Sequence, residues 1–129
     1  MNYERMIENY WKDALAQDAD SMKLYFEDDA FVNWHNSNEH FTLEEYICAN
    51  CEYPNKWDGK IERMQCFPQQ VISVVHVYAK DKSVSFHATS FFTMSHNGRI
   101  QSIDEYWGED GEPPKWRIEK QIGTKIKDL

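Results

Sequence analysis

Residues 83–107, SVSFHATSFFTMSHNGRIQSIDEYW, decide the fold. The Asn97-Gly98 pair between two alternating segments is a strong short-range signal for a β-hairpin. Along the first segment every second side chain is apolar or small: Val84, Phe86, Ala88, Ser90, Phe92 and Met94. This alternation predicts a strand that turns one face to the core of the protein.

The same pattern extends in both directions from the long strand. We expect further strands at 61–67, 71–79 and 99–107. Pro68 cannot donate to a sheet, so the strand before it is expected at an edge or beside a bulge. Asp81 with its lysine neighbours is expected to close a second hairpin. Together these segments predict an antiparallel meander.

The first third of the chain has a helical pattern. Residues 2–17 carry apolar side chains at intervals of three and four, which predicts an amphipathic helix. Asp18 or Asp20 can cap a second, short helix that continues through Tyr25 and Phe26. The acidic residues EDDA that follow are expected to end that helix.

A strand is expected at 30–41, in which Val32, Trp34 and Asn36 share one face. Thr42 and Glu45 then form a capping box that opens a helix over 43–51. Near the C-terminus, residues 116–126 are expected to form a short extended tail. Helices followed by an antiparallel meander with one apolar face predict an α+β fold.

The composition limits the possible functions. The 129 residues carry a net charge of −8, whereas nucleic-acid-binding proteins gather Lys and Arg on one face. No segment reaches the ~18 apolar residues of a membrane span, and the first 17 residues lack a signal-peptide core. The length predicts one domain over 1–129, with a tail from about residue 112. Three cysteines, an odd number in a chain without an export signal, indicate reduced thiols and a cytoplasmic location.

Two segments, YWKDALAQDADSMKLYFEDDAFVNW (10–34) and HNGRIQSIDEYWGED (96–110), carry a resemblance to a known family. They resemble the nuclear transport factor 2-like superfamily, within it the SnoaL-like and ketosteroid-isomerase-like branch. The resemblance implies a cone-shaped fold, in which N-terminal helices pack on a strongly curved antiparallel sheet and enclose an apolar pocket. Because functions are carried by sites rather than folds, it does not by itself imply an activity.

The resemblance also tests one mechanism. Ketosteroid isomerases use an Asp general base together with a Tyr and a protonated Asp as hydrogen-bond donors. Laid on that pattern, Tyr10 takes the place of the tyrosine, Trp34 that of the general base and Ser90 that of the protonated acid. Two of the three groups differ, so steroid isomerisation by this mechanism is not expected.

Glu105 and Tyr10 are the candidate catalytic residues. Glu105 is the candidate acid/base, and the Tyr10 hydroxyl is a candidate hydrogen-bond donor to a ligand oxygen. Alternation along the last strand turns Ile103, Glu105 and Trp107 inward. A carboxyl group among aromatic rings has a raised pKa and can transfer protons. In the alternative, Glu105 is structural and bonded to one of three side chains: Tyr10, Asn36 or Trp34.

The candidate ligand-binding residues are expected to line the predicted pocket. They are Trp34, Asn36, Cys51, Ser90, Ile103 and Trp107. Core packing explains the two tryptophans equally well, and a core tyrosine bonded to the backbone explains Tyr10 equally well. Cys48 and Cys51 form a C-x-x-C late in a helix, which we interpret as two packed cysteines rather than a redox pair.

The histidines do not predict a metal site. His35 and His40 are five residues apart on one predicted strand, so their imidazoles would point to opposite faces. His76 and His87 are expected as surface histidines on the outer face of the sheet. We therefore predict neither a metal nor a cofactor.

Two functional hypotheses follow. The first is a SnoaL-like pocket protein that binds a small, largely apolar, ring-containing or carbonyl-bearing molecule. Such a protein could catalyse cofactor-free proton transfer, as in isomerisation, cyclisation or dehydration. The second is a non-catalytic binding or association module that forms a homodimer through the outer sheet face. A cavity of several hundred Å³ that reaches solvent would favour the first hypothesis.

Overall fold

The structure is a computed structural model that describes residues 2–127. In chain order its elements are α1 (Tyr3–Leu15), α2 (Ala19–Lys23), β1 (Phe26–Trp34), β2 (Glu39–Thr42), α3 (Leu43–Cys51), β3 (Trp57–Cys66), β4 (Gln70–Ala79), β5 (Ser85–Met94), β6 (Ile100–Glu109) and α4 (Lys115–Glu119). This is the predicted α+β order of helices first and a meander afterwards.

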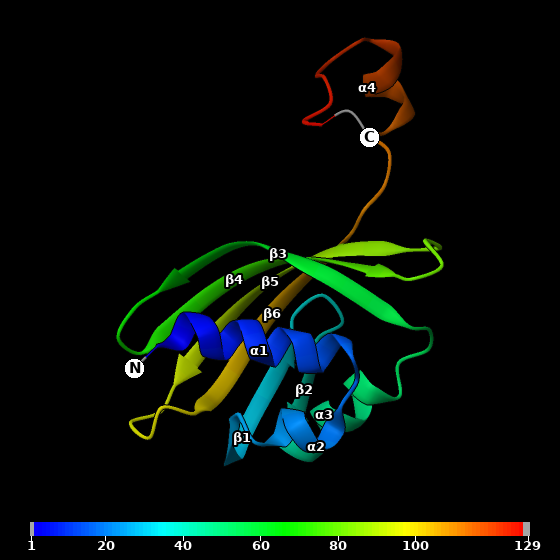
Figure 1. Cartoon of the computed structure of the whole chain (residues 1–129). Coiled ribbons are helices and arrows are strands. Elements are labelled where there is room, and N and C mark those ends of the chain that lie inside the picture. Colours follow the sequence, from blue (N-terminus) through cyan, green and yellow to red (C-terminus); the bar gives the residue numbers. More distant parts are fainter. Residues whose placement is uncertain (1, 128–129) are drawn as a thin grey trace.

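The six strands form one curved, open sheet in the order β2-β1-β6-β5-β4-β3. Strands β3 to β6 are the predicted antiparallel meander, and β2 pairs antiparallel with β1. Only β1 and β6 pair in parallel among the described strands. Figure 1 shows α1 lying across the concave side of the sheet, with α2 and α3 beside β1 and β2. The sheet and helices therefore have the predicted cone-like arrangement.

Helix α1 forms where the apolar spacing predicts it. The Asn2 side chain caps its first turn by accepting from the backbone N–H of Arg5. Its buried stripe consists of Ile7, Tyr10, Trp11 and Ala14. The predicted capping box of α3 is also present, with Thr42 and Glu45 each bonded to the other's backbone. Both helices thus start at chemically defined residues.

The predicted strand over 30–41 is wrong, because residues 35–38 form a turn between β1 and β2. Asn38 has a positive φ of 58°, a conformation that asparagine tolerates better than most residues. Asn36 therefore lies in a turn and does not continue the face of Val32 and Trp34. The signal for this hairpin was the polar run from His35 to Asn38.

Three other boundaries differ from the predictions. Helix α2 ends at Lys23, so Phe26 and the acidic EDDA residues belong to β1 instead of to a helix and its end. Strand β3 begins at Trp57, four residues before the predicted start. The C-terminal segment contains the short helix α4 and is not simply extended. Tertiary pairing explains the first two differences, since both segments gain partners in the sheet.

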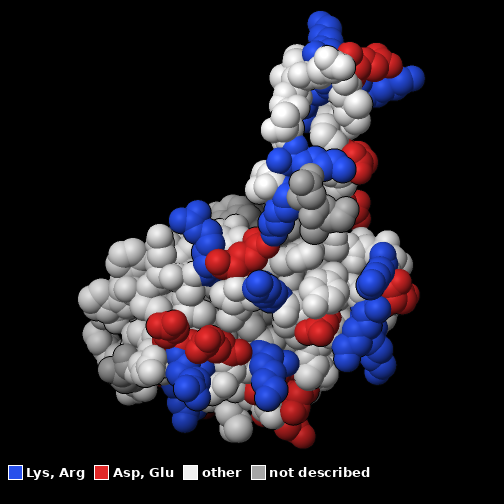
Figure 2. Space-filling model, turned by 45° about the horizontal axis from the view of Figure 1, so that its top comes forward, with Lys and Arg blue, Asp and Glu red and all other residues white. Residues whose placement is uncertain are grey.

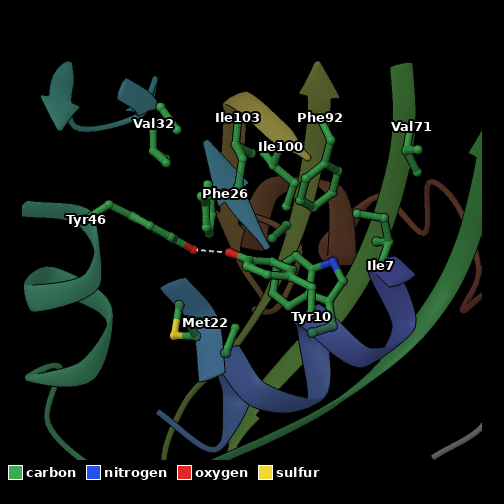
Figure 3. Close-up of a cluster of buried hydrophobic side chains, with 14 of the residues drawn as sticks. Ile7, Tyr10, Met22, Phe26, Val32, Tyr46, Val71, Phe92, Ile100 and Ile103 are labelled. Atoms are coloured by element: carbon green, nitrogen blue, oxygen red, sulfur yellow. Dashed lines mark hydrogen bonds between the residues drawn. The ribbon is translucent and has the colours of Figure 1, made fainter. Parts of the chain in front are cut away.

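The core lies between the concave face of the sheet and the helices. Ala88, Ser90, Phe92 and Met94 are buried, as the alternation along β5 predicts. Figure 3 shows the centre of this core, where Tyr10 from α1 and Tyr46 from α3 point toward each other among aliphatic and aromatic side chains. Edge-to-face contacts join Tyr10 to Phe26 and Phe92, which makes the centre rich in rings.

The C-terminal tail stands away from the rest of the chain (Figure 1). Its helix α4 has no buried residue, and Trp116 is 55% exposed. On the face in Figure 2, Lys and Arg alternate with Asp and Glu over body and tail, so that face has no continuous basic surface. Among residues 2–127, no helix combines the length and hydropathy that a membrane span needs. The cytoplasmic location stays a prediction.

Candidate functional site

A cavity of about 360 Å³ opens between the C-terminal half of α1, the β1–β2 turn and the sheet. Its lining residues are Trp11, Ala14, Leu15, Gln17, Trp34, Asn36, Ser37, Glu39, Asn50, Tyr53, Trp57, Val77, Phe86 and Trp107. Strands β3 to β6 and β1 each contribute at least one residue to this wall. The cavity therefore exists only when the whole sheet and α1 are assembled.

Four of the five tryptophans of the chain line this cavity. Three of them, with Phe86, form a row of neighbouring rings along the wall. The ring centroids of Trp34 and Trp107 are 6.4 Å apart, and those of Trp107 and Phe86 are 5.9 Å apart. Trp57 extends the wall, with its centroid 6.1 Å from that of Phe86. Such a surface offers large flat apolar contacts to a ligand.

The mouth of the cavity is polar. Asn36, Ser37 and Glu39 come from the β1–β2 hairpin and are exposed. The Asn36 Oδ1 atom accepts a hydrogen bond of 2.6 Å from the backbone N–H of Trp107, which fixes the turn against β6. Glu39 is the one charged residue in the described lining, so the cavity offers no cation to an anionic ligand and too few ligands for a metal ion.

Two amide side chains tie α1 to α3 at the side of the cavity. Gln17 donates from Nε2 to the backbone carbonyls of Asn50 and Tyr53, at 3.0 and 2.9 Å. Asn50 donates from Nδ2 to the carbonyl of Ala14 at 3.0 Å. Gln17 has a positive φ of 57° where the chain turns after α1. These bonds hold the end of α1 in a fixed position over the aromatic wall.

Glu105 lies behind the cavity wall in the core and is 0% exposed. Its Oε1 accepts from the indole N–H of Trp34 at 2.9 Å, and its Oε2 accepts from the Ser90 hydroxyl at 2.5 Å. Burial raises the pKa of Glu105 above its ordinary value, and the donors Ser90 and Trp34 oppose that rise. The carboxyl group is therefore held in place by two donors, the Trp34 indole and the Ser90 hydroxyl, and does not line the cavity.

Trp107 stands between Glu105 and the cavity. Its indole N–H is buried and has no hydrogen-bond acceptor in the described chain. As a donor near Glu105, this N–H still opposes the rise in the pKa of that carboxyl group, although the two groups do not reach the geometry of a full hydrogen bond. This buried N–H is therefore only partly satisfied, which costs free energy.

Tyr10 and Tyr46 share a hydrogen bond between their hydroxyl groups inside the core (Figure 3). Burial raises the pKa of both phenols well above the ordinary value, and the nearby Glu105 raises both further. Both hydroxyls therefore stay protonated. Because each is the partner of the other and both side chains are fully buried, the pair joins α1 to α3.

The structure divides the predicted site residues into two groups. Trp34, Asn36 and Trp107 line the cavity, together with several aromatic residues that sequence reasoning missed. The other candidates lie outside its lining: Tyr10, Cys51, Ser90, Ile103 and Glu105. The missed residues were Trp11, Tyr53, Trp57 and Phe86, of which Trp11 and Phe86 had the inward spacing that could have identified them.

The two cysteines of the C-x-x-C differ. Cys51 is partly buried, and its thiol contacts the Met22 sulfur at 3.7 Å. Cys48 is exposed and donates to the Glu52 carboxylate at 2.8 Å, so the prediction that both cysteines are packed is wrong for Cys48. Glu52 raises the pKa of Cys48 and burial raises that of Cys51. Neither thiol has the lowered pKa of a redox-active cysteine.

Comparisons with known proteins agree on the architecture. A ketosteroid isomerase candidate from Kribbella flavida DSM 17836 is similar with a TM-score of 0.78 and 15% identity, over 96% of this chain and 89% of that one. An NTF-2 like protein of unknown function from Burkholderia xenovorans LB400 has a TM-score of 0.76 and 19% identity, over 96% and 94%.

A candidate SnoaL-like polyketide cyclase from Shewanella putrefaciens CN-32 has a TM-score of 0.68 and 15% identity, over 83% of this chain and 80% of that one. No protein-family model matches the chain, and no curated protein matches it by sequence. At such identities the likeness is one of fold. This chain therefore has the nuclear transport factor 2-like fold, the fold of ketosteroid isomerase-like and SnoaL-like proteins.

Proposed function

We propose that the protein binds a small, ring-containing, largely apolar molecule in the tryptophan-lined cavity. The observation that carries the proposal is a cavity of about 360 Å³ with four tryptophans in its wall and exposed polar residues at its mouth. Its size lies within the range of small-molecule sites. A ring ketone suits it, because aromatic walls contact the ring system and the mouth supplies polar groups for a carbonyl.

We place binding ahead of catalysis for this protein. Proton transfer by Glu105 would require the reacting atom to approach the carboxyl group, which lies outside the cavity lining. Both of its oxygens already accept hydrogen bonds, from Trp34 and Ser90. Glu105→Gln separates the two hypotheses. If the variant keeps both ligand binding and any catalytic activity of the wild type, Glu105 has a structural role. If it binds the ligand but loses turnover, Glu105 transfers protons.

The binding proposal can be tested with 1-indanone, a bicyclic ketone. The Trp116→Phe variant is the reference protein, because Trp116 is the one tryptophan outside the cavity lining and all remaining indole emission then comes from the wall. We expect 1-indanone to quench this emission in a saturable manner. We expect the anion indane-1-carboxylate to bind more weakly, because the cavity carries Glu39 and no cation.

A second variant fills the cavity. Ala14 is buried and lines it, so Ala14→Phe places a ring in the space that a ligand would occupy. In the Trp116→Phe background we expect affinity for 1-indanone to fall at least about tenfold, which corresponds to ~1.4 kcal/mol. Trp57→Ala, which removes part of the wall, should also weaken binding. Equal quenching in reference and filled proteins, or none in the reference, would contradict the proposal.

A second candidate function is association through the outer sheet face. Outward-facing Val74 and Phe91 are only partly buried there, and Tyr106 is 45% exposed. An exposed apolar patch of this kind is typical of a protein contact. Analytical ultracentrifugation of the wild type and Phe91→Lys tests this proposal. A dimer that the substitution dissociates supports it, and a wild-type monomer at high concentration contradicts it.

A further inference from the structure

A cluster of metal-binding side chains lies on the outer face of the sheet, away from the cavity. His76 on β4 and His87 on β5 are directly opposite each other in the antiparallel ladder. Their imidazole rings stack with centroids 4.7 Å apart and planes 7° apart. Glu62 on β3 completes the outer-face cluster, and one ligand atom from each of the three residues lies within 4.8 Å of the other two.

A β-bulge brings Glu62 to this position. Ile61 pairs with Val75 and Arg63 pairs with Val74, so Glu62 is the extra residue between two successive pairs. The bulge breaks the strict alternation of β3, and both Glu62 and Arg63 are exposed on the outer side. Bulges commonly re-aim a side chain beside functional sites. Here the re-aimed carboxylate lies 3.3 Å from Nε2 of His87.

Asp110, just after β6, holds the imidazole of His87 from the other side. Its Oδ1 lies 2.5 Å from His87 Nδ1. Its Oδ2 accepts a 2.7 Å hydrogen bond from the Ser85 hydroxyl and lies 3.3 Å from Nε2 of His76, so Asp110 contacts both imidazoles. A carboxylate at Nδ1 favours a proton on Nδ1, so Nε2, which contacts Glu62, is the nitrogen that would exchange its proton for a metal ion. The residue opposite His87 on β6 is Gly108, whose missing side chain leaves this part of the face open.

We propose that Glu62, His76 and His87 form a binding site for a divalent transition metal, Zn²⁺ in the first place, with Asp110 as a positioning residue. Two imidazoles and one carboxylate are an established ligand set for zinc, and they leave a fourth position for water. Zinc-bound histidines usually donate their other N–H to a carboxylate, which is the geometry of Asp110 and His87. The site rests on observations separate from those that support ligand binding in the cavity.

The side chains need to move only slightly to hold the ion. Zinc–ligand bonds of about 2.1 Å put tetrahedral ligand atoms about 3.4 Å apart. Starting from a spread of at most 4.8 Å, the three ligand atoms must close by about 1.4 Å, which rotations of partly exposed side chains allow. Lys127 contacts the site with Nζ 3.5 Å from Glu62, and the ion would replace this contact.

Another histidine–carboxylate pair provides a matched control. His35 lies 2.8 Å from Asp104, and its ring stacks on Tyr106 with centroids 4.3 Å apart. This pair has the same two chemical groups, but its second neighbour is a phenol ring instead of another imidazole. Removal of His35 should therefore leave the zinc affinity unchanged. The C-x-x-C thiols are the other possible zinc ligands, and Cys48→Ser/Cys51→Ser controls for them.

The test is a Zn²⁺ titration of metal-stripped protein in competition with a chromophoric chelator. We expect the wild type, His35→Ala and the double Cys→Ser variant to bind one equivalent of zinc with equal affinity. His76→Ala, His87→Ala and Glu62→Gln should each lose at least about tenfold in affinity. The proposal would be overturned if the double Cys→Ser variant lost its affinity for zinc. It would also be overturned if the His76→Ala/His87→Ala double variant bound zinc with the affinity of the wild type.

Asp110 needs a measurement that separates positioning from stability. Asp110→Asn should lower zinc affinity about 10- to 100-fold while Co²⁺-loaded protein keeps the absorption bands of the same ligand set. In the zinc-loaded protein, imidazole nitrogen NMR should show His87 bound to zinc through Nε2 with Nδ1 protonated in the wild type, and a mixture of Nε2-bound and Nδ1-bound forms in the variant. If Asp110→Asn binds zinc like the wild type, Asp110 has no positioning role. The melting temperature of each metal-free variant confirms that it is folded, and His87→Gln replaces any alanine variant that is not.

Discussion

Glu105 is a carboxylate that the core holds between donors from two other strands. Trp34 reaches it from β1 and Ser90 from β5, while Glu105 itself is on β6. Three strands are thus joined through one side chain. Full burial raises the pKa of Glu105, and its hydrogen-bond donors offset only part of this rise. The ionised carboxylate therefore reduces the stability of the fold.

The pH dependence of stability tests this interpretation. The folded pKa of Glu105 lies above its unfolded value of about 4.3, so the protonated state favours folding and the cost of ionisation grows as pH rises above that value. Glu105→Gln keeps the shape without the charge. We expect its free energy of unfolding, relative to the wild type, to increase from pH 4 toward pH 8, measured by urea denaturation. A difference that is constant with pH would contradict the interpretation.

For single residues, the sequence predicts which face of a strand a side chain points to better than whether it lies in the core or in the cavity. Alternation along β6 correctly turns Ile103, Glu105 and Trp107 inward, and the burial of Glu105 with a bonded Trp34 is among the predicted alternatives. Inward, however, includes both a filled core and an open cavity. Which of the two a side chain faces depends on the volumes of all its neighbours, and no periodicity records those volumes.

At Gly59, strand β3 lies close to both β4 and the end of α1. A Cβ atom built on Gly59 would lie 2.7 Å from the backbone oxygen of His76 and 3.1 Å from a methyl group of Leu15. Glycine is thus required mainly by the close approach of the β4 backbone, and the end of the helix adds a second close contact. The same contact lets Leu15 from α1 and Trp57 from β3 border one cavity.

Gly59→Ala should therefore destabilise the protein by about 1–3 kcal/mol, because backbone or helix must shift to remove the clash. Gly111 provides the matched control, since a Cβ there meets no atom within 4 Å. Gly111→Ala should change the free energy of unfolding by less than about 0.5 kcal/mol. Urea denaturation of both variants measures the difference. Equal stability of the two would show that the helix end adjusts freely.

Elements with local signals were predictable, and those defined by distant partners were not. Helix α1 follows its apolar spacing and α3 its capping box, while Asn97-Gly98 closes the β5–β6 hairpin. The start of β3 at Trp57 depends on pairing with Ala79, 22 positions later in the chain's numbering. The acidic start of β1 depends likewise on β6. A local window contains neither partner.

For the whole molecule, the cavity and the tail are separate. The tail beyond Gly111 presents exposed apolar residues, and Ile126 is 98% exposed. Its contact with the body includes the bond from Lys127 to Glu62, which is an exposed ion pair of small value. Neither α4 nor the segment before it contributes to the cavity lining.

A chain that ends at Gly111 should therefore keep the stability and ligand binding of the full protein. We expect the free energy of unfolding to change by less than about 1 kcal/mol, and 1-indanone to quench the cavity tryptophans with unchanged affinity. Urea denaturation and fluorescence titration check both statements. Loss of more than ~2 kcal/mol would mean that the tail packs on the body in a way that its exposure does not indicate.

The parallel pairing of β1 with β6 imposes an order in time on the synthesis of the chain. Trp34 and Glu105 are 71 positions apart, and β6 leaves the ribosome after the other described strands. Chains grow at about 5–20 residues per second, so β1 waits several seconds with one edge unpaired. Neither the central sheet nor the cavity can form before then. A ribosome that stalls before β6 is complete would leave a strand edge open to aggregation, so the synthesis of β6 is a decisive step for this sheet.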